Sequence, residues 1–161
     1  MRGTTIILAA IALMLLLGSC ATSRVPYVPS VSFECRLSVW PTFEPPTEYL
    51  VQRDSFGRST ITEFRYRGAG GYGPKRSGTP IVHIIDSKQW GNFTEAVRKH
   101  DPWTIPTKQP YMSGLDGTTM ILEIRDGDRH HRVQRWAPFG YKSERTIVEF
   151  STAVISLLPE R

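Results

Sequence analysis

A strict two-residue alternation from Val31 to Trp40 is the feature of the sequence that most constrains the fold. Successive side chains of a β-strand point to opposite faces of the sheet. One face of this segment is apolar and includes Cys35, whereas the other carries Ser32, Glu34, Arg36, Ser38 and Trp40. The pattern predicts a half-buried antiparallel strand with the Cys35 thiol packed in the core as a small hydrophobe.

Similar periodicities predict the other elements. Apolar residues at helical spacing indicate one helix, capped by Ser87 and running to about His100, and another from Ser143 to just before Pro159. Further strands are expected at Glu48–Arg53, Ser59–Tyr66, Ile81–Ile85, Thr118–Arg125 and Arg129–Trp136. We therefore expect residues 31–161 to form a single α+β domain, an antiparallel sheet of about six strands with two helices packed on one face.

The N-terminal segment begins with Met1-Arg2 and continues into an apolar run of twelve residues, Ile6–Leu17. A helix of that length spans about 18 Å, well short of the ~30 Å hydrocarbon core of a bilayer. With Leu17-Gly18-Ser19-Cys20 at its end, the segment resembles a bacterial lipoprotein signal peptide with its lipobox. The resemblance implies that residues 1–19 are cleaved and that Cys20 is acylated, for example with palmitate, as a membrane anchor.

The residues after the lipobox indicate where such a lipoprotein would reside. By the same resemblance, Ala21 in place of an aspartate implies the outer membrane of a Gram-negative cell envelope, with the domain in the periplasm. Residues 20–30 would then be the lipidated cysteine and an extended tether. The alternative is an ordinary secretory signal cut after Ala21, because small residues also satisfy that peptidase.

Charge and cysteine content restrict the partners. Loss of residues 1–19 leaves 142 residues and lowers the formal charge from +5 to +4, because Arg2 is the only charged residue removed. This mild charge is spread along the chain, so we expect no nucleic-acid partner. Cys35 remains the only cysteine with a free thiol after either cleavage, and we expect no intrachain disulfide.

The glycine-rich segment 68–73 matches the spacing G-x-G-x-x-G of dinucleotide-binding loops. Such a loop must open a helix whose amide groups point at the phosphates, and Pro74, Gly78 and Pro80 prevent a helix here. We expect 67–80 to be a loop, with a candidate basic surface for headgroups, glycan or a partner formed by Arg65, Arg67, Tyr72, Lys75 and Arg76. The alternative is a solvated hairpin loop without a binding role.

The histidines do not predict a metal site. His130 and His131 are adjacent on an expected strand, so they point to opposite faces and cannot hold one ion. The sequence also has no Gly-x-Ser-x-Gly nucleophile motif. We therefore expect no catalytic residue, no metal and no cofactor.

The segment from Gly114 to Pro138 is the densest in polar and aromatic residues. Gly-Leu-Asp-Gly at 114–117, Leu-Glu at 122–123 and His-x-Val-x-x-Trp-x-Pro at 131–138 together resemble uncharacterised exported bacterial domains of this size. The likeness covers about residues 85–158 and implies no activity. We interpret part of this segment as a candidate binding surface, formed by Asp116, Glu123, His131, Arg135 and Trp136.

A structural alternative exists for the same residues. Glu123 would lie opposite His130 or His131 in the hairpin, where a cross-strand ion pair fixes the register. Trp136 would then be a core aromatic, which is the reading we expect for this residue.

These observations favour an outer-membrane-anchored periplasmic lipoprotein that is a binding or accessory envelope component, with an envelope protein or glycan as partner, and not an enzyme. One alternative is a hydrolase of cell-wall or glycan substrates that uses Glu123 and His131. Another is an immunity-like lipoprotein that blocks an incoming toxin.

Overall fold

The computed structural model describes residues 31–109, 116–140 and 144–160. The predicted signal peptide, Cys20 and the tether lie outside the described residues, as does Ser143. Six strands are present: β1 (Val31–Pro41), β2 (Thr47–Asp54), β3 (Ser59–Arg67), β4 (Lys75–Ile85), β5 (Thr118–Asp126) and β6 (Arg129–Trp136). The helices are α2 (Ser87–His100) and α3 (Arg145–Ile155), with short 3₁₀ turns η1 (Gly70–Tyr72), η2 (Pro102–Thr104) and η3 (Pro138–Gly140).

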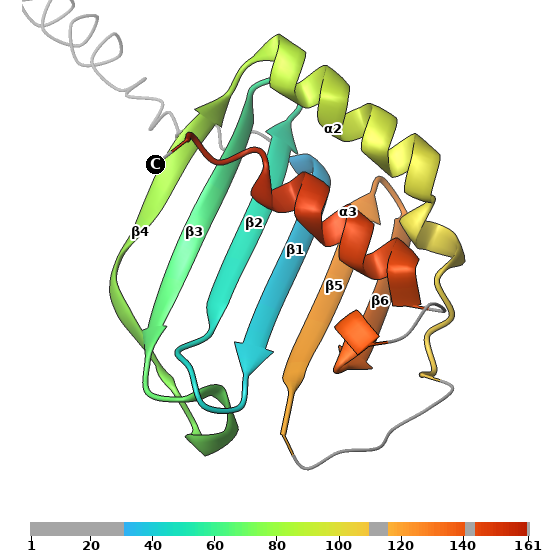
Figure 1. The fold of residues 1–161 in the computed structure, drawn as a ribbon. Helices are drawn as coiled ribbons and strands as arrows, with labels where there is room; N and C mark the ends of the chain where they lie inside the picture. Colours follow the sequence, from blue (N-terminus) through green and yellow to red (C-terminus); the bar gives the residue numbers. More distant parts are fainter. Residues whose placement is uncertain (1–30, 110–115, 141–143, 161) are drawn as a thin grey trace, which may run out of the picture.

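The strands form one antiparallel sheet in the order β4-β3-β2-β1-β5-β6. Figure 1 shows α2 and α3 lying across the same face of this sheet. The other face carries no helix among the described elements, and we call it the open face. The predicted α+β architecture, with about six strands and two helices on one face, is confirmed.

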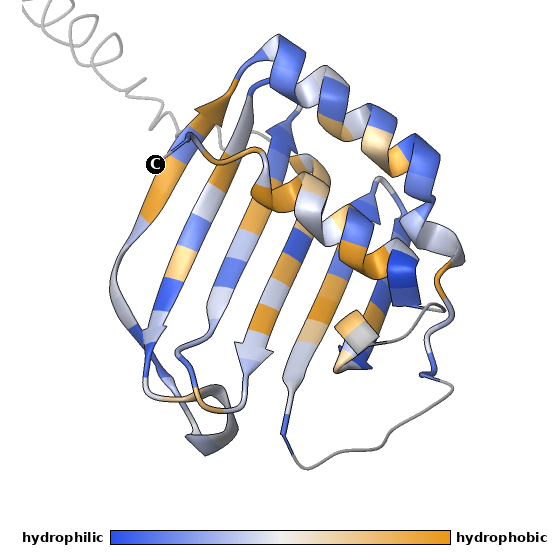
Figure 2. Ribbon diagram, viewed as in Figure 1, coloured by the Kyte–Doolittle hydropathy of each residue, from blue (hydrophilic) through white to orange (hydrophobic). Residues whose placement is uncertain are grey.

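The core lies between the sheet and the helices and follows the predicted alternation of β1. Cys35 pairs with Val51 on one side and Ile124 on the other, and all three are fully buried. Apolar residues of the two helices belong to the same buried cluster, and orange segments alternate with blue ones along α2 and α3 in Figure 2. The most buried helix residues are Phe93, Ile147, Phe150 and Val154. Removing such side chains from water is the main stabilising contribution to a fold of this kind.

Two local predictions are corrected. Asp86, rather than Ser87, caps α2: its carboxylate accepts the backbone N–H of Gln89, and the Gln89 side chain accepts that of Asp86. This reciprocal capping box satisfies two donors at the helix start.

The second correction concerns the expected loop 67–80. Strand β4 begins already at Lys75, within that range. A register shift between Glu63 and Arg65 of β3 accommodates Gly78, which has a φ of 74°, and Pro80. An edge strand tolerates a proline because one side of its backbone needs no hydrogen-bond partner. Within the described part of the chain, no helix is both long and apolar enough to cross a membrane.

Candidate functional site

The five residues of the candidate binding surface do not share one face of the domain. Asp116 is exposed just before β5, and Glu123 and Trp136 lie on the open face. Trp136 is only half-buried there, so the expectation that it is a core aromatic is wrong. His131 and Arg135 have the opposite parity on β6 and lie on the face that the helices cover. A strand alternates its side chains, so residues 131 and 136 cannot contact one ligand on one face.

Arg135 is a structural residue rather than an accessible one. It is 1% exposed, and its Nε donates to Glu144 Oε2 at 2.6 Å. The guanidinium also donates to the carbonyl oxygens of Gln134 and Pro106. The ion pair therefore joins β6 to the start of α3 in a region closed to solvent, where no partner can reach it.

The side chains of His131 and Glu123 make their contacts on opposite faces of the sheet. The Nε2 atom of His131 lies 2.9 Å from the carbonyl oxygen of Ile105 and ties β6 to the segment after η2. Glu123 pairs in register with Arg132, not with either histidine, and its Oε1 contacts His130 Nε2 diagonally at 3.0 Å. The predicted direct opposition of Glu123 to a histidine is therefore wrong, because the turn at 126–129 sets a different register.

Partial burial raises the pKa of Glu123, but hydrogen bonds from Arg125 and His130 outweigh it, so the net pKa is lowered. The Glu123 carboxylate consequently stays charged at neutral pH within a half-exposed cluster of basic side chains. Such a cluster is chemically unlike the paired carboxylates of a glycoside hydrolase.

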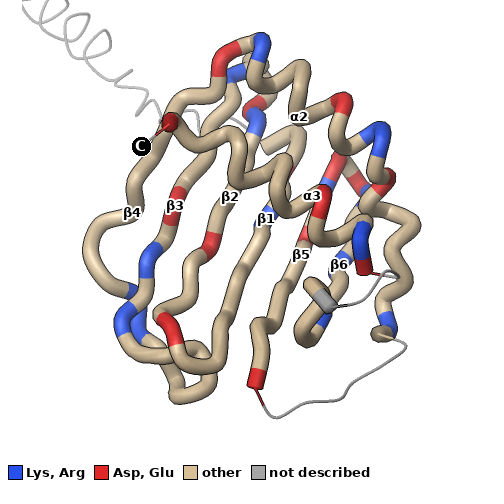
Figure 3. The backbone as a smooth tube through the Cα atoms, in the orientation of Figure 1, with Lys and Arg blue, Asp and Glu red and all other residues tan. Residues whose placement is uncertain are grey.

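The candidate basic surface is also divided. Figure 3 shows blue segments gathered where β3 runs into β4. Arg65 is held by Glu63 at 3.0 Å, whereas Arg76 turns onto the open face and donates to Glu48 at 3.1 Å and to the hydroxyl of Tyr66. Arg67, Tyr72 and Lys75 are exposed, with Tyr72 at 74%. Two of the five candidate residues are thus already occupied by ion pairs.

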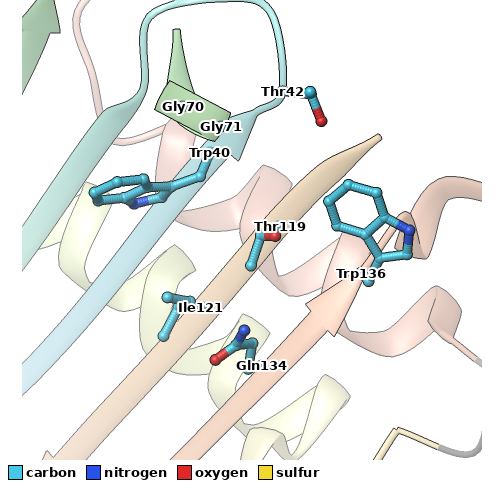
Figure 4. A pocket seen from close by; sticks show the side chains of 8 residues that line it. All are labelled: Trp40, Thr42, Gly70, Gly71, Thr119, Ile121, Gln134 and Trp136. Atoms are coloured by element: carbon cyan, nitrogen blue, oxygen red, sulfur yellow. The ribbon is translucent and has the colours of Figure 1, made fainter. Parts of the chain in front are cut away.

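A pocket that the sequence analysis missed lies at one end of the open face (Figure 4). Its volume is about 270 Å³, and it is lined by Trp40, Thr42, Gly70, Gly71, Thr119, Ile121, Gln134 and Trp136. The indoles of Trp40 and Trp136 stand on opposite sides, with Thr119 and Ile121 of β5 between them. We call this cavity the tryptophan pocket. The available signal was Trp40, a large aromatic placed by the β1 alternation on the otherwise polar face.

Close backbone contacts hold the rim of the pocket in place. A Cβ on Gly70 would lie 2.3 Å from the carbonyl oxygen of Pro41, so only glycine allows η1 to approach the end of β1 this closely. Gly71 donates its amide to the carbonyl oxygen of Thr42 at 3.1 Å. Thr42 in turn donates its amide and hydroxyl to the carbonyl oxygen of Gly117, at 2.8 and 2.9 Å. The pocket is therefore preformed.

The polar groups of the pocket are few and neutral. The indole N–H of Trp40 is buried and has no hydrogen-bond partner among the described residues, while its ring lies 5.5 Å from that of Tyr66. Gln134 contributes a side-chain amide and Thr119 a hydroxyl. None of the residues described as lining the pocket is titratable. The described lining can thus supply aromatic faces and neutral hydrogen-bonding groups, and it contains no titratable acid or base.

The described residues contain no group of three or more His, Cys, Asp and Glu suited to a metal ion. No model of a protein family matches the chain, and no curated protein is significantly similar to it in sequence.

Proposed function

We propose that this chain is an outer-membrane-anchored periplasmic lipoprotein whose domain binds an envelope glycan in the tryptophan pocket. The observation that carries the proposal is the placement of two indoles on opposite sides of one preformed cavity. A pyranose ring has an apolar C–H face and a rim of hydroxyl groups. Tryptophan offers the largest aromatic face of any side chain, and such a face can stack on the C–H face of the sugar. The neutral hydrogen-bonding groups of the pocket suit the hydroxyl rim.

The polar groups support a neutral ring as the occupant. The side-chain amide of Gln134 and the hydroxyl of Thr119 belong to the lining and would lie beside the hydroxyl groups of a bound ring. Gln134 can both donate to and accept from adjacent hydroxyls.

The residues described as lining the tryptophan pocket favour a binding function over the hydrolase alternative. Glycoside cleavage requires two carboxyl groups that flank the scissile bond. Glu123 and His131, the residues proposed for that alternative, lie on opposite faces of the sheet. The tryptophan pocket, in contrast, offers contact surface and has no carboxyl group among its described lining residues.

The test is a titration of the mature chain carrying Cys20→Ser, which removes the expected lipid anchor. Tryptophan fluorescence and calorimetry are followed as N-acetylglucosamine oligosaccharides are added. We expect Trp136→Ala and Trp40→Ala each to weaken binding at least about tenfold, or about 1.4 kcal/mol. Trp40→Phe keeps an aromatic ring but offers a smaller face, and we expect an intermediate loss.

The matched control is Phe56→Ala, which removes an aromatic ring that is 65% exposed in the turn between β2 and β3, away from the pocket. It should bind as the parent chain does. The proposal is wrong if no oligosaccharide binds, or if a folded Trp40→Ala, Trp136→Ala double variant binds with unchanged affinity.

A further inference from the structure

A second hollow adjoins Trp136. It has a volume of about 370 Å³ and is lined by Lys108, Gln109, Gln134 and Trp136. It shares Gln134 and Trp136 with the tryptophan pocket. Both shared residues belong to β6, the edge strand of the sheet. The two hollows are therefore neighbours at this edge of the sheet, with Gln134 and Trp136 lining both.

We propose that these hollows are two subsites of one site, and that its ligand is an acidic oligosaccharide of at least two rings that crosses β6. This inference rests on the proposed function, because it takes the tryptophan pocket to bind a sugar. It adds the length of the ligand, its direction across the edge strand and its charge.

The sizes of the hollows support a ligand longer than one ring. Pockets for drug-sized ligands measure about 300–1,000 Å³. The tryptophan pocket, at about 270 Å³, is below that range, and the second hollow, at about 370 Å³, is near its lower end. Each volume suits one ring, so a chain of two or more rings uses both.

Contacts with Gln109 and Gly117 fix the position of Trp136 at the sheet edge. The side-chain amide of Gln109 makes two hydrogen bonds to the Trp136 backbone, accepting from its N–H at 2.6 Å and donating to its carbonyl oxygen at 2.8 Å. Gly117 lies under the indole, where a Cβ would come within 3.1 Å of the ring. A fixed aromatic side chain loses little entropy on binding, which is the property required of a stacking platform.

The charge preference comes from Lys108. It is exposed and is the one titratable side chain among the described residues that line either hollow. No carboxylate within the described residues forms an ion pair with it. An ammonium group in the second hollow favours a sugar that carries a free carboxylate, as N-acetylmuramic acid does in cell-wall strands whose lactyl groups bear no peptide.

The first experiment is a length series with the mature Cys20→Ser chain. N-acetylglucosamine and its dimer and tetramer are compared with cell-wall disaccharide and tetrasaccharide strands that contain N-acetylmuramic acid. We expect the tetramers to bind at least about tenfold more tightly than the single sugar. The two-subsite proposal is overturned if the single sugar binds as tightly as the tetramers, in which case loss of binding in Trp40→Ala would still uphold the tryptophan pocket.

The second experiment separates charge from length. We expect Lys108→Gln to weaken binding of the acidic tetrasaccharide about three- to tenfold and to leave the neutral tetramer unchanged, with the difference shrinking in high salt. Lys88→Gln, an exposed lysine in the first turn of α2, is the control and should change neither affinity. Equal losses for both sugars, or no loss for either, would overturn the acidic preference. Absence of binding by every sugar would instead refute the proposed function itself.

Discussion

Arg135 of β6 and Glu144, the residue before α3, form a salt bridge at 2.6 Å in which both side chains are at most 5% exposed. Two charges removed from water in this way require close pairing, because each alone pays a large desolvation cost. The guanidinium meets this requirement with its additional backbone acceptors. The pair therefore fixes the position of α3 relative to the sheet edge.

We predict that Glu144→Gln destabilises the domain by about 3–5 kcal/mol, because it leaves the Arg135 charge buried without a counter-ion. Urea unfolding monitored by circular dichroism would measure the loss. The exposed pair Arg145–Glu149 provides the control, since its side chains are 75% and 38% exposed. Arg145→Gln should cost under about 1 kcal/mol, and equal costs for the two variants would contradict the role assigned to the buried pair.

The Cys35 thiol is predicted to be unreactive in the folded protein. Cys35 is 0% exposed, and its burial raises the pKa of the thiol, to which the neighbouring Glu34 carboxylate adds. Because the thiolate is the reactive form, both inaccessibility and the raised pKa slow modification. In the Cys20→Ser chain, a thiol reagent should react at least about a hundredfold faster after denaturation. In the folded protein, the thiol becomes accessible only in the rare molecules in which the core around it has opened. Comparable rates before and after denaturation would show that the β1 register is wrong.

Glu123 should stabilise the domain in a pH-dependent way. Its folded-state pKa is lowered, so its contribution is present above the unfolded-state value of about 4.5 and is lost as pH falls through the folded value. We expect Glu123→Gln to cost about 0.2–1 kcal/mol at pH 7, as cross-strand pairs do, and almost nothing at pH 3. Thermal melts of both chains at the two pH values would test this. An equal stability difference between the two chains at pH 7 and pH 3 would mean that the charge of the Glu123 carboxylate does not stabilise the domain.

The sequence was sufficient to predict the core because the core depends on local periodicity. The β1 alternation, the α2 stripe of Trp90, Phe93 and Val97 and the hairpin at Asp126-Gly127 each follow from spacing within a few residues. The start of β4 at Lys75 could not be predicted in this way. It depends on β3 supplying a pairing edge across a glycine and a proline that locally disfavour a strand.

The tryptophan pocket could not be predicted because it depends on strand order. Trp40 and Trp136 lie far apart in the sequence and come together because β5 pairs with β1 instead of β4. Local patterns do not determine that order. The placement of His131 and Trp136 on opposite faces, in contrast, follows from their spacing on β6 alone. Residues an odd number of positions apart on a strand point to opposite faces, so the two could not form one surface.

The last prediction concerns the membrane anchor, which remains a proposal based on Leu17-Gly18-Ser19-Cys20. Several acyl chains on one cysteine would hold the protein firmly, since each buried methylene contributes about 0.8 kcal/mol. Metabolic labelling with a palmitate analogue should mark the wild-type chain and not Cys20→Ser. In a Gram-negative host, the wild-type protein should fractionate with the outer membrane.

Cys35→Ser is the matched control for this experiment, because Cys35 is a buried thiol in the core. It should be labelled as strongly as the wild type if it folds, which circular dichroism can establish. Equal labelling of Cys20→Ser and wild type would refute acylation at Cys20. A wild-type chain that is exported, unlabelled and shortened to begin after Ala21 would instead support the ordinary secretory signal. The glycan-binding proposal would survive that result, because the tryptophan pocket is built entirely from residues of the folded domain.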